Sequence, residues 1–169
     1  MEAKELLRLQ FKQANQFVEM TMDGLTQDIA DRKIPGSTIN TIARVYGHMV
    51  LDQDLMVGGM VKGGDLVLTK DGWGAKVGVT DPNPRQTDEW AEHKVDVAAF
   101  REYARAVYAA TDAFLAGAPD ADLAKEVDSP LGKQPAIVFL GTIGLSHVNE
   151  HWGEIAALKG VQGLKGLPF

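Results

Sequence analysis

The chain has 169 residues, of which 45% are hydrophobic and 24% are charged, with a net charge of −6 and no cysteine. This length and composition are typical of one globular domain, so we expect residues 1–169 to form a single domain. An acidic chain without clusters of basic residues repels phosphate backbones and anionic lipids, which argues against nucleic acid and membrane surfaces as partners.

The absence of cysteine excludes disulfides, iron–sulfur clusters, cysteine-based zinc sites and a protein thiol as nucleophile. It is also consistent with a reducing, cytoplasmic location. No apolar run approaches the ~18 residues of a membrane-spanning helix, and the polar segment Met1–Glu5 has no apolar signal-peptide core behind it.

Two segments in the first third of the chain have the apolar periodicity of amphipathic helices. The first extends from about Lys4 to Asp31 and is ended by Ile34-Pro35-Gly36. The second begins with Ser37 as its N-cap and runs to about Met60, where paired glycines end it. The apolar stripe of the second helix comprises Ile39, Ile42, Val45, Tyr46, Met49 and Met56.

Residues 62–92 are rich in glycine and proline, and this predicts an irregular connection with one short strand at Leu66–Thr69. A connection of about 30 residues is unusually long for a compact domain. In a helical bundle it can cross the whole length of the bundle, so that the helices before and after it run parallel.

Two further helices are predicted over about Val95–Ala116 and Ala136–Lys159, with Gly160 as the residue that ends the second of them. The tail, Gly163–Phe169, is irregular and is expected to lie back along the bundle. The predicted fold is therefore an all-α four-helix bundle with one long crossover between its second and third helices.

His147 and His151 are separated by four residues on the last predicted helix, so both imidazoles lie on one face, about 6 Å apart at Cβ. They fall within the apolar arc of that helix, which includes Leu140 and Leu158. Neutral imidazoles that point into a core need polar partners, and a shared divalent cation satisfies both at once.

His48 lies near the middle of the second predicted helix, level with His147, and can face a neighbouring helix. Asp52 follows it by one turn and can orient its second ring nitrogen. His93, which precedes the third helix among charged residues, is predicted to be solvated. The alternative interpretation of His48 is a core histidine with ordinary hydrogen-bond partners.

Two acids and one glycine accompany the histidine pair on the last helix. Glu150 and Glu154 flank the histidine-bearing face, and Glu150 is a candidate for orienting ligands or moving protons. Gly144 precedes His147 by about one turn, and the missing side chain can leave room for a substrate. The alternative for both acids is a solvated helix edge.

Other metal and nucleophile motifs are less well matched. The segment from His147 to His151 reads H-x-x-E-H, an inverted zinc-protease pattern, but no acid or histidine follows Glu154 to serve as a third ligand. A di-iron bundle needs Glu-x-x-His on two helices, and this chain has no such pair. Phosphate-binding loops and serine-nucleophile motifs are absent from the sequence.

The order of these features resembles the DinB-like superfamily of four-helix bundles: one histidine in the second helix, a long crossover, then H-x-x-x-H in the fourth helix. The final segment, HVNEHWGEIAALKGVQGLKGLPF (residues 147–169), is similar to the end of many members, as is WGAKVGV (residues 73–79) in the crossover. The resemblance covers essentially the whole chain.

This resemblance implies an up-down-down-up bundle, a divalent metal ion held by His48, His147 and His151, and a homodimer. Characterised relatives include bacillithiol-dependent S-transferases and a mycothiol-dependent isomerase. Imidazole ligands suit both zinc and nickel, so the resemblance does not select the metal.

The sequence therefore predicts a metal-dependent transferase or hydrolase that acts on a small electrophile, with the metal activating water or an external small-molecule thiol. Asp52 and Glu150 would orient ligands or move protons, and Gly144 would leave room for substrate. The alternative is a non-catalytic, metal-binding dimeric bundle with a structural or sensing role in a stress response.

Overall fold

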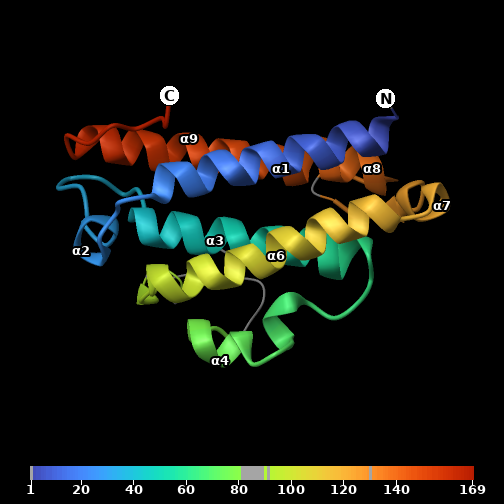
Figure 1. The fold of residues 1–169 in the computed structure, drawn as a ribbon, viewed down its shortest axis with the longest axis horizontal. Helices are drawn as coiled ribbons and strands as arrows, with labels where there is room; N and C mark the ends of the chain where they lie inside the picture. The colour runs from blue at the N-terminus through green and yellow to red at the C-terminus, as the bar shows by residue number, and fades with distance from the viewer. Residues whose placement is uncertain (1, 81–89, 91, 130) are drawn as a thin grey trace.

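The computed structural model describes residues 2–80, 90, 92–129 and 131–169. Four long helical rods dominate this part of the chain (Figure 1), and they comprise α1 (Ala3–Met22), α3 (Ile42–Asp54) with its π-helical continuation η1 (Leu55–Val61), α6 (Val97–Gly117), and α8 (Ala136–Phe139) with the π-helical η3 (Leu140–Gly144) and α9 (Leu145–Val161). The shorter elements are α2 (Gln27–Ala30), the 3₁₀ turn η2 (Val67–Thr69), α4 (Trp73–Val77), α7 (Asp120–Leu123), β1 (Glu126–Val127) and β2 (Gln134–Pro135).

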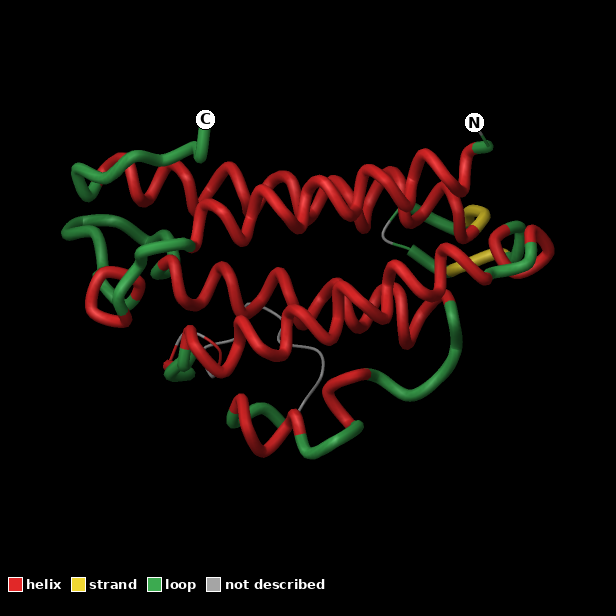
Figure 2. Tube along the Cα trace, viewed as in Figure 1, coloured by secondary structure: helices red, strands yellow, loops and turns green. Residues whose placement is uncertain are grey.

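The direction of the rods confirms the predicted topology. Figure 1 shows α1 and α9 running one way while α3 and α6 run the other way, so the order is up-down-down-up. The described part of the connection after α3, up to residue 80, returns along the bundle, as the parallel arrangement requires. Helices account for nearly all of the regular structure in the described ranges, where the strands are confined to the loop before α8 (Figure 2).

The core lies along the axis between the four rods, where each rod contributes apolar side chains at intervals of three or four residues. The largest fully buried side chains are Phe11, Met22, Ile42, Tyr46, Met49, Leu51, Phe100, Tyr103, Leu115, Phe139, Leu140 and Ile155. Burial of each such side chain stabilises the fold by about 1.5–3 kcal/mol before entropy is counted. None of the described helices is both long and apolar enough to cross a membrane.

The first predicted helix is too long. It ends at Met22, because Asp23 is extended and Gly24 has φ +75°, a left-handed conformation that glycine adopts without strain. A separate short helix, α2, follows with Thr26 as its N-cap. The periodicity of apolar residues continued through this break and concealed it.

The second helix begins later than predicted. The Thr41 hydroxyl, not that of Ser37, accepts a hydrogen bond from a helical N–H, that of Arg44 at 3.4 Å. Ser37 instead accepts from Ile39 N within a turn, and Ile39 is 40% exposed and outside the apolar stripe. Serine and threonine are both good N-caps, and tertiary packing decides between Ser37 and Thr41.

The predicted strand at Leu66–Thr69 is wrong, since this segment forms the 3₁₀ turn η2. The Asp54 carboxylate accepts hydrogen bonds from the N–H groups of Val67 at 3.0 Å and Leu68 at 2.9 Å, which leaves no ladder partner for a strand. The strands that do form, β1 and β2, pair antiparallel through Val127 and Gln134 in a loop predicted to be irregular.

The last helix ends at Val161, and the left-handed residue that follows it is Gly163 at φ +80°, not Gly160. The tail then lies back along the bundle, as predicted. Its Phe169 ring lies 5.4 Å from Phe17 and 6.1 Å from Trp152, measured between ring centroids. A Cβ at Gly166 would lie 2.5 Å from the Ala156 carbonyl oxygen, so the close passage over α9 requires glycine.

Candidate metal centre

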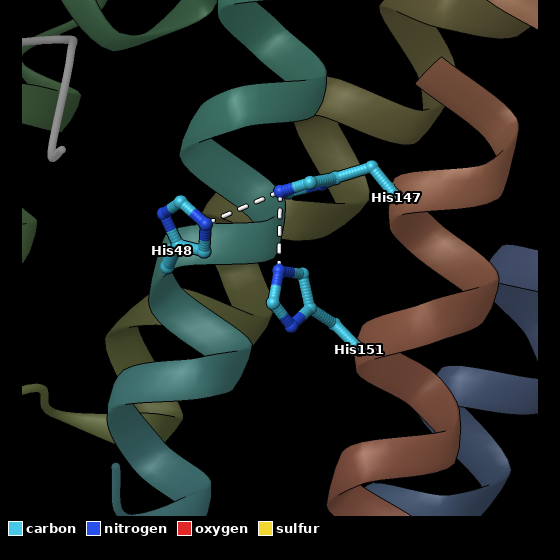
Figure 3. A group of neighbouring side chains, drawn as sticks. All are labelled: His48, His147 and His151. Carbon is cyan, nitrogen blue, oxygen red and sulfur yellow. Dashed lines mark hydrogen bonds between the residues drawn. The ribbon is translucent and has the colours of Figure 1, made fainter. Parts of the chain in front are cut away.

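Two neighbouring helices supply the three histidines that the sequence analysis selected. His48 projects from α3, and His147 and His151 project from successive turns of α9, which packs beside α3. Figure 3 shows the three rings directed toward one another across the space between the two helices. The spacing of four residues on α9 places both of its imidazoles on the side that faces α3.

The ring nitrogens lie close enough to share one ion. The Nε2 atom of His147 is 3.2 Å from Nε2 of His48 and 3.1 Å from Nε2 of His151 (Figure 3). The donor atoms of all three residues lie within 4.8 Å of one another. Two imidazole nitrogens bound at ~2.0–2.1 Å to one ion, with an angle of about 100° between them, are separated by a similar distance.

His147 is the least satisfied of the three imidazoles as a purely hydrogen-bonded group. A neutral ring nitrogen is either a donor or an acceptor, but its Nε2 faces two other Nε2 atoms. Its Nδ1 is buried without a hydrogen-bond partner among the described residues. Burial, and then the nearby His151 and His48, lower the pKa of His147 to about 3, so the ring is neutral and can offer a lone pair.

Asp52 lies beside this group, as its position one turn after His48 predicts. Its Oδ1 is 3.6 Å from His48 Nδ1, and its Oδ2 is 3.2 Å from His147 Nε2. Burial raises the pKa of Asp52 to about 7, and His151 opposes this effect. A carboxyl group that titrates near neutral pH next to the ring nitrogens is well placed for proton transfer.

Glu154 is the site residue that sequence reasoning did not single out. Its Oε2 lies 2.8 Å from His151 Nδ1, one turn further along α9. From the sequence, Glu154 was expected only to flank the histidine-bearing face of the last helix. Its spacing of three residues from His151 was the available signal, because residues at that interval are neighbours on a helix.

The two remaining candidates lie further from the rings. Glu150 is exposed, and it makes no hydrogen bond or ion pair with the three histidines in the described structure. Gly144 is buried, and a Cβ added to it would meet Phe11 at 3.4 Å and Met56 at 3.9 Å. Core side chains therefore border the position where its side chain would be.

Each histidine-bearing rod also contains a π-helical segment close to the site. η1 begins at Leu55, three residues after Asp52, and η3 ends at Gly144, three residues before His147. Their i→i−5 hydrogen bonds join Lys62 N to Val57 O and Leu145 N to Leu140 O. Such turns are rare and often occur at functional sites, because the extra residue changes the direction of the side chains that follow.

His93 corrects another expectation, since it is partly buried rather than solvated. Its ring stacks on Trp90 at 5.0 Å between centroids with an interplanar angle of 13°. Its carbonyl oxygen accepts a hydrogen bond of 3.1 Å from Nε of Arg44 on α3. The segment before α6 therefore packs on α3, and His93 is outside the metal-binding group found among the described residues.

The fold and the site define a helical bundle with a candidate three-histidine metal centre between its second and last long rods. The chain matches the DinB superfamily over residues 10–155, and it belongs to that superfamily. This confirms the resemblance derived from its histidine order and final segment.

A crystal structure of a conserved protein from Enterococcus faecalis has the same fold. The two structures align with a TM-score of 0.79 and 19% sequence identity, over 96% of this chain and 99% of the other. No curated protein is similar enough to this chain to count as a match. The structural similarity confirms the all-α bundle, and the superfamily and the three histidines together fit a metal-binding protein.

Proposed function

We propose that this protein is a metal-dependent enzyme in which His48, His147 and His151 hold a divalent ion. We further propose that it transfers water or a small-molecule thiol to a small electrophile. The observation that carries this proposal is the approach of His147 Nε2 to Nε2 of His48, at 3.2 Å, and to Nε2 of His151, at 3.1 Å, because one ring nitrogen with a single proton or lone pair cannot make a full hydrogen bond to both.

A divalent ion such as zinc or nickel, when bound there, acts as a Lewis acid and lowers the pKa of a coordinated water or thiol to about 7. Three protein ligands leave a position for that nucleophile or for substrate. Because the chain has no cysteine, a thiol nucleophile must be supplied by a second small molecule.

The proposed roles of the other residues follow from their positions. Asp52, with a pKa of about 7, can accept a proton from a nucleophile and release it near neutral pH. Glu150, on the exposed flank of α9, is proposed to orient a substrate at the entrance, and it makes no hydrogen bond or ion pair with the three ion-binding histidines in the described structure. Gly144, about one turn before His147, is proposed to leave room for substrate because it adds no side chain beside the core residues Phe11 and Met56.

A homodimer is a further proposal, which the family resemblance implies, and a cytoplasmic location is proposed from the absence of cysteine. Exposed apolar side chains on α1, namely Leu6, Leu9 and Met20, supply surface that a second copy could cover. Light scattering on the purified protein tests this part separately, with a dimer mass expected and a monomer mass contradicting it.

The test of the main proposal is elemental analysis of protein purified without a histidine tag. We expect about one zinc or nickel ion per chain, lost in a His147→Ala variant, and turnover of a thiol with a panel of electrophiles only in the metal-loaded protein. A wild-type content below roughly 0.2 ions per chain, unchanged after addition of zinc or nickel, would contradict the site.

A second function, a non-catalytic metal-binding protein, is favoured by the burial of the histidines. Their side chains are only 13–17% exposed, as expected for a structural ion. This function predicts that His147→Ala loses metal and lowers the melting temperature, while the loaded wild type stays inactive toward every thiol and electrophile pair.

A further inference from the structure

The three imidazoles differ in what holds the ring nitrogen that faces away from the cluster. His151 Nδ1 lies 2.8 Å from the Glu154 carboxylate, which is a full hydrogen bond. His48 Nδ1 lies 3.6 Å from Asp52, beyond hydrogen-bond distance. His147 Nδ1 has no hydrogen-bond partner among the described residues. The Glu154 carboxylate therefore holds the His151 ring from the side that faces away from the cluster.

The contact with Glu154 determines the tautomer of His151. A carboxylate accepts hydrogen bonds, so the proton of the neutral ring must lie on Nδ1. Nε2 then carries a lone pair, and this atom is the one that faces His147 at 3.1 Å. A charge-assisted bond of 2.8 Å also restricts rotation of the ring.

The charge of Glu154 acts in the same direction. Three neutral imidazoles bring no negative charge to a divalent ion, and among the described residues Asp52 and Glu154 place their carboxylates against the rings. The Glu154 side chain is 27% exposed, so solvent screens it only in part. Its contact with His151 transmits electron density to the ring and makes Nε2 a stronger ligand.

We propose that Glu154 is a positioning residue that fixes the tautomer and orientation of His151 for metal binding. This inference rests on the proposed function, because it assumes that the three histidines bind an ion. No other ion pair or hydrogen bond of the Glu154 carboxylate occurs within the described part of the chain. Its side chain therefore has no second structural task there.

Glu150 provides a matched control on the same helix. It has the same charge and lies one turn earlier on α9, but it is exposed and makes no contact of this kind with a histidine. Glu154→Ala and Glu150→Ala thus remove equal charge and give the same gain in helix propensity. Only the first removes a hydrogen bond to a ligand ring.

The experiment is a zinc titration against a chromophoric chelator for the wild type and both variants. We expect Glu154→Ala to weaken zinc binding by about 10–100-fold and Glu150→Ala to change it by less than about twofold. Glu154→Gln should fall between wild type and Glu154→Ala, because an amide oxygen can still accept the bond without the charge. The melting temperature in EDTA should be nearly the same for all variants.

Three results would overturn the inference: unchanged affinity in Glu154→Ala, equal weakening in Glu150→Ala, or a melting temperature in EDTA that falls as much as the metal-loaded one. Long-range ¹H–¹⁵N NMR of metal-free wild type gives an independent readout. It should show His151 protonated at Nδ1, and protonation at Nε2 instead contradicts the role of Glu154. If the wild type binds no zinc, the proposed function is contradicted. The NMR measurement of the His151 tautomer still tests the role of Glu154 in that case.

Discussion

Two aspartates on α3, Asp52 and Asp54, lie two positions apart in the chain but in different surroundings. Asp54 is 4% exposed and accepts hydrogen bonds from Val67 N, Leu68 N and the Tyr103 hydroxyl, at 3.0, 2.9 and 2.7 Å. Asp52 faces the imidazoles of the candidate metal centre, and burial raises its pKa to about 7.

The difference lies in the donors that surround each carboxylate. Backbone N–H groups and a buried hydroxyl are fixed donors, so their hydrogen bonds to Asp54 attach the crossover to the bundle. The neighbours of Asp52 are groups that can themselves gain protons or bind a metal. The first arrangement stabilises the fold, whereas the second leaves a carboxyl group free to exchange a proton.

The largest effect is expected at Asp54. Asp54→Asn should lower the free energy of unfolding by about 3–5 kcal/mol, because an amide cannot accept from both backbone N–H groups and the tyrosine hydroxyl, and its own donors would oppose them. Urea unfolding of the metal-free protein measures this loss.

The same substitution at Asp52 sharpens the comparison. Asp52→Asn removes a buried group that is costly to ionise, so the metal-free protein should lose much less stability at neutral pH than Asp54→Asn does. Equal losses at the two positions would contradict the distinction between them.

The pH dependence of the metal-free protein gives the second prediction. Asp52 alone would make stability fall as the pH rises from about 4 to about 7, because its raised pKa keeps a proton that the unfolded chain releases. His147 alone would make stability fall as the pH drops from about 6.5 to about 3, because the unfolded chain binds a proton in this range that the folded ring, with its lowered pKa, does not bind. Between about pH 4 and 6.5 these two effects cancel.

Single substitutions at Asp52 and His147 should reveal the two opposing effects on stability separately. In Asp52→Asn, stability should decline as the pH falls below about 6.5, by up to about 1.4 kcal/mol per pH unit. In His147→Gln, it should decline as the pH rises above about 4, with a similar slope. Denaturant unfolding in EDTA across this range measures both slopes, and parallel curves for both variants and wild type would rule out the assignment.

The smallest effect concerns the hydroxyl that Asp54 binds. Tyr103→Phe removes one donor of three but keeps the buried ring, so we expect a loss of about 1.5 kcal/mol in the free energy of unfolding. Its loss should be strongly reduced in an Asp54→Asn background, as a double-mutant cycle would show. Additive losses would show that the two side chains do not act together.

The four rods and the pair His147 and His151 were predictable because both follow from local periodicity, whereas His48 was added by its level in the bundle and by the resemblance to the DinB-like superfamily. Spacing of four residues places His147 and His151 on one face whatever surrounds them. The turn at Leu66–Thr69 was not predictable in this way, since it depends on the Asp54 carboxylate of α3. The N-cap at Thr41 and the stacking of His93 on Trp90 each join residues three positions apart, but that spacing alone did not select them over Ser37 as the cap or over solvent around His93. Glu154 was an intermediate case. Its spacing from His151 was suitable for a contact, but the sequence alone did not show that Glu154, and not Glu150, makes the hydrogen bond to a histidine.

The π-helical segments have a consequence for comparing this chain with its relatives. A turn closed by an i→i−5 hydrogen bond holds one residue more than an ordinary helical turn, so η1 and η3 each accommodate an extra residue without breaking the rod. Relatives with regular helices there should align only with single-residue gaps inside the helices. An alignment that forbids such gaps would shift His48 against His147 and His151, and would hide a shared ligand set.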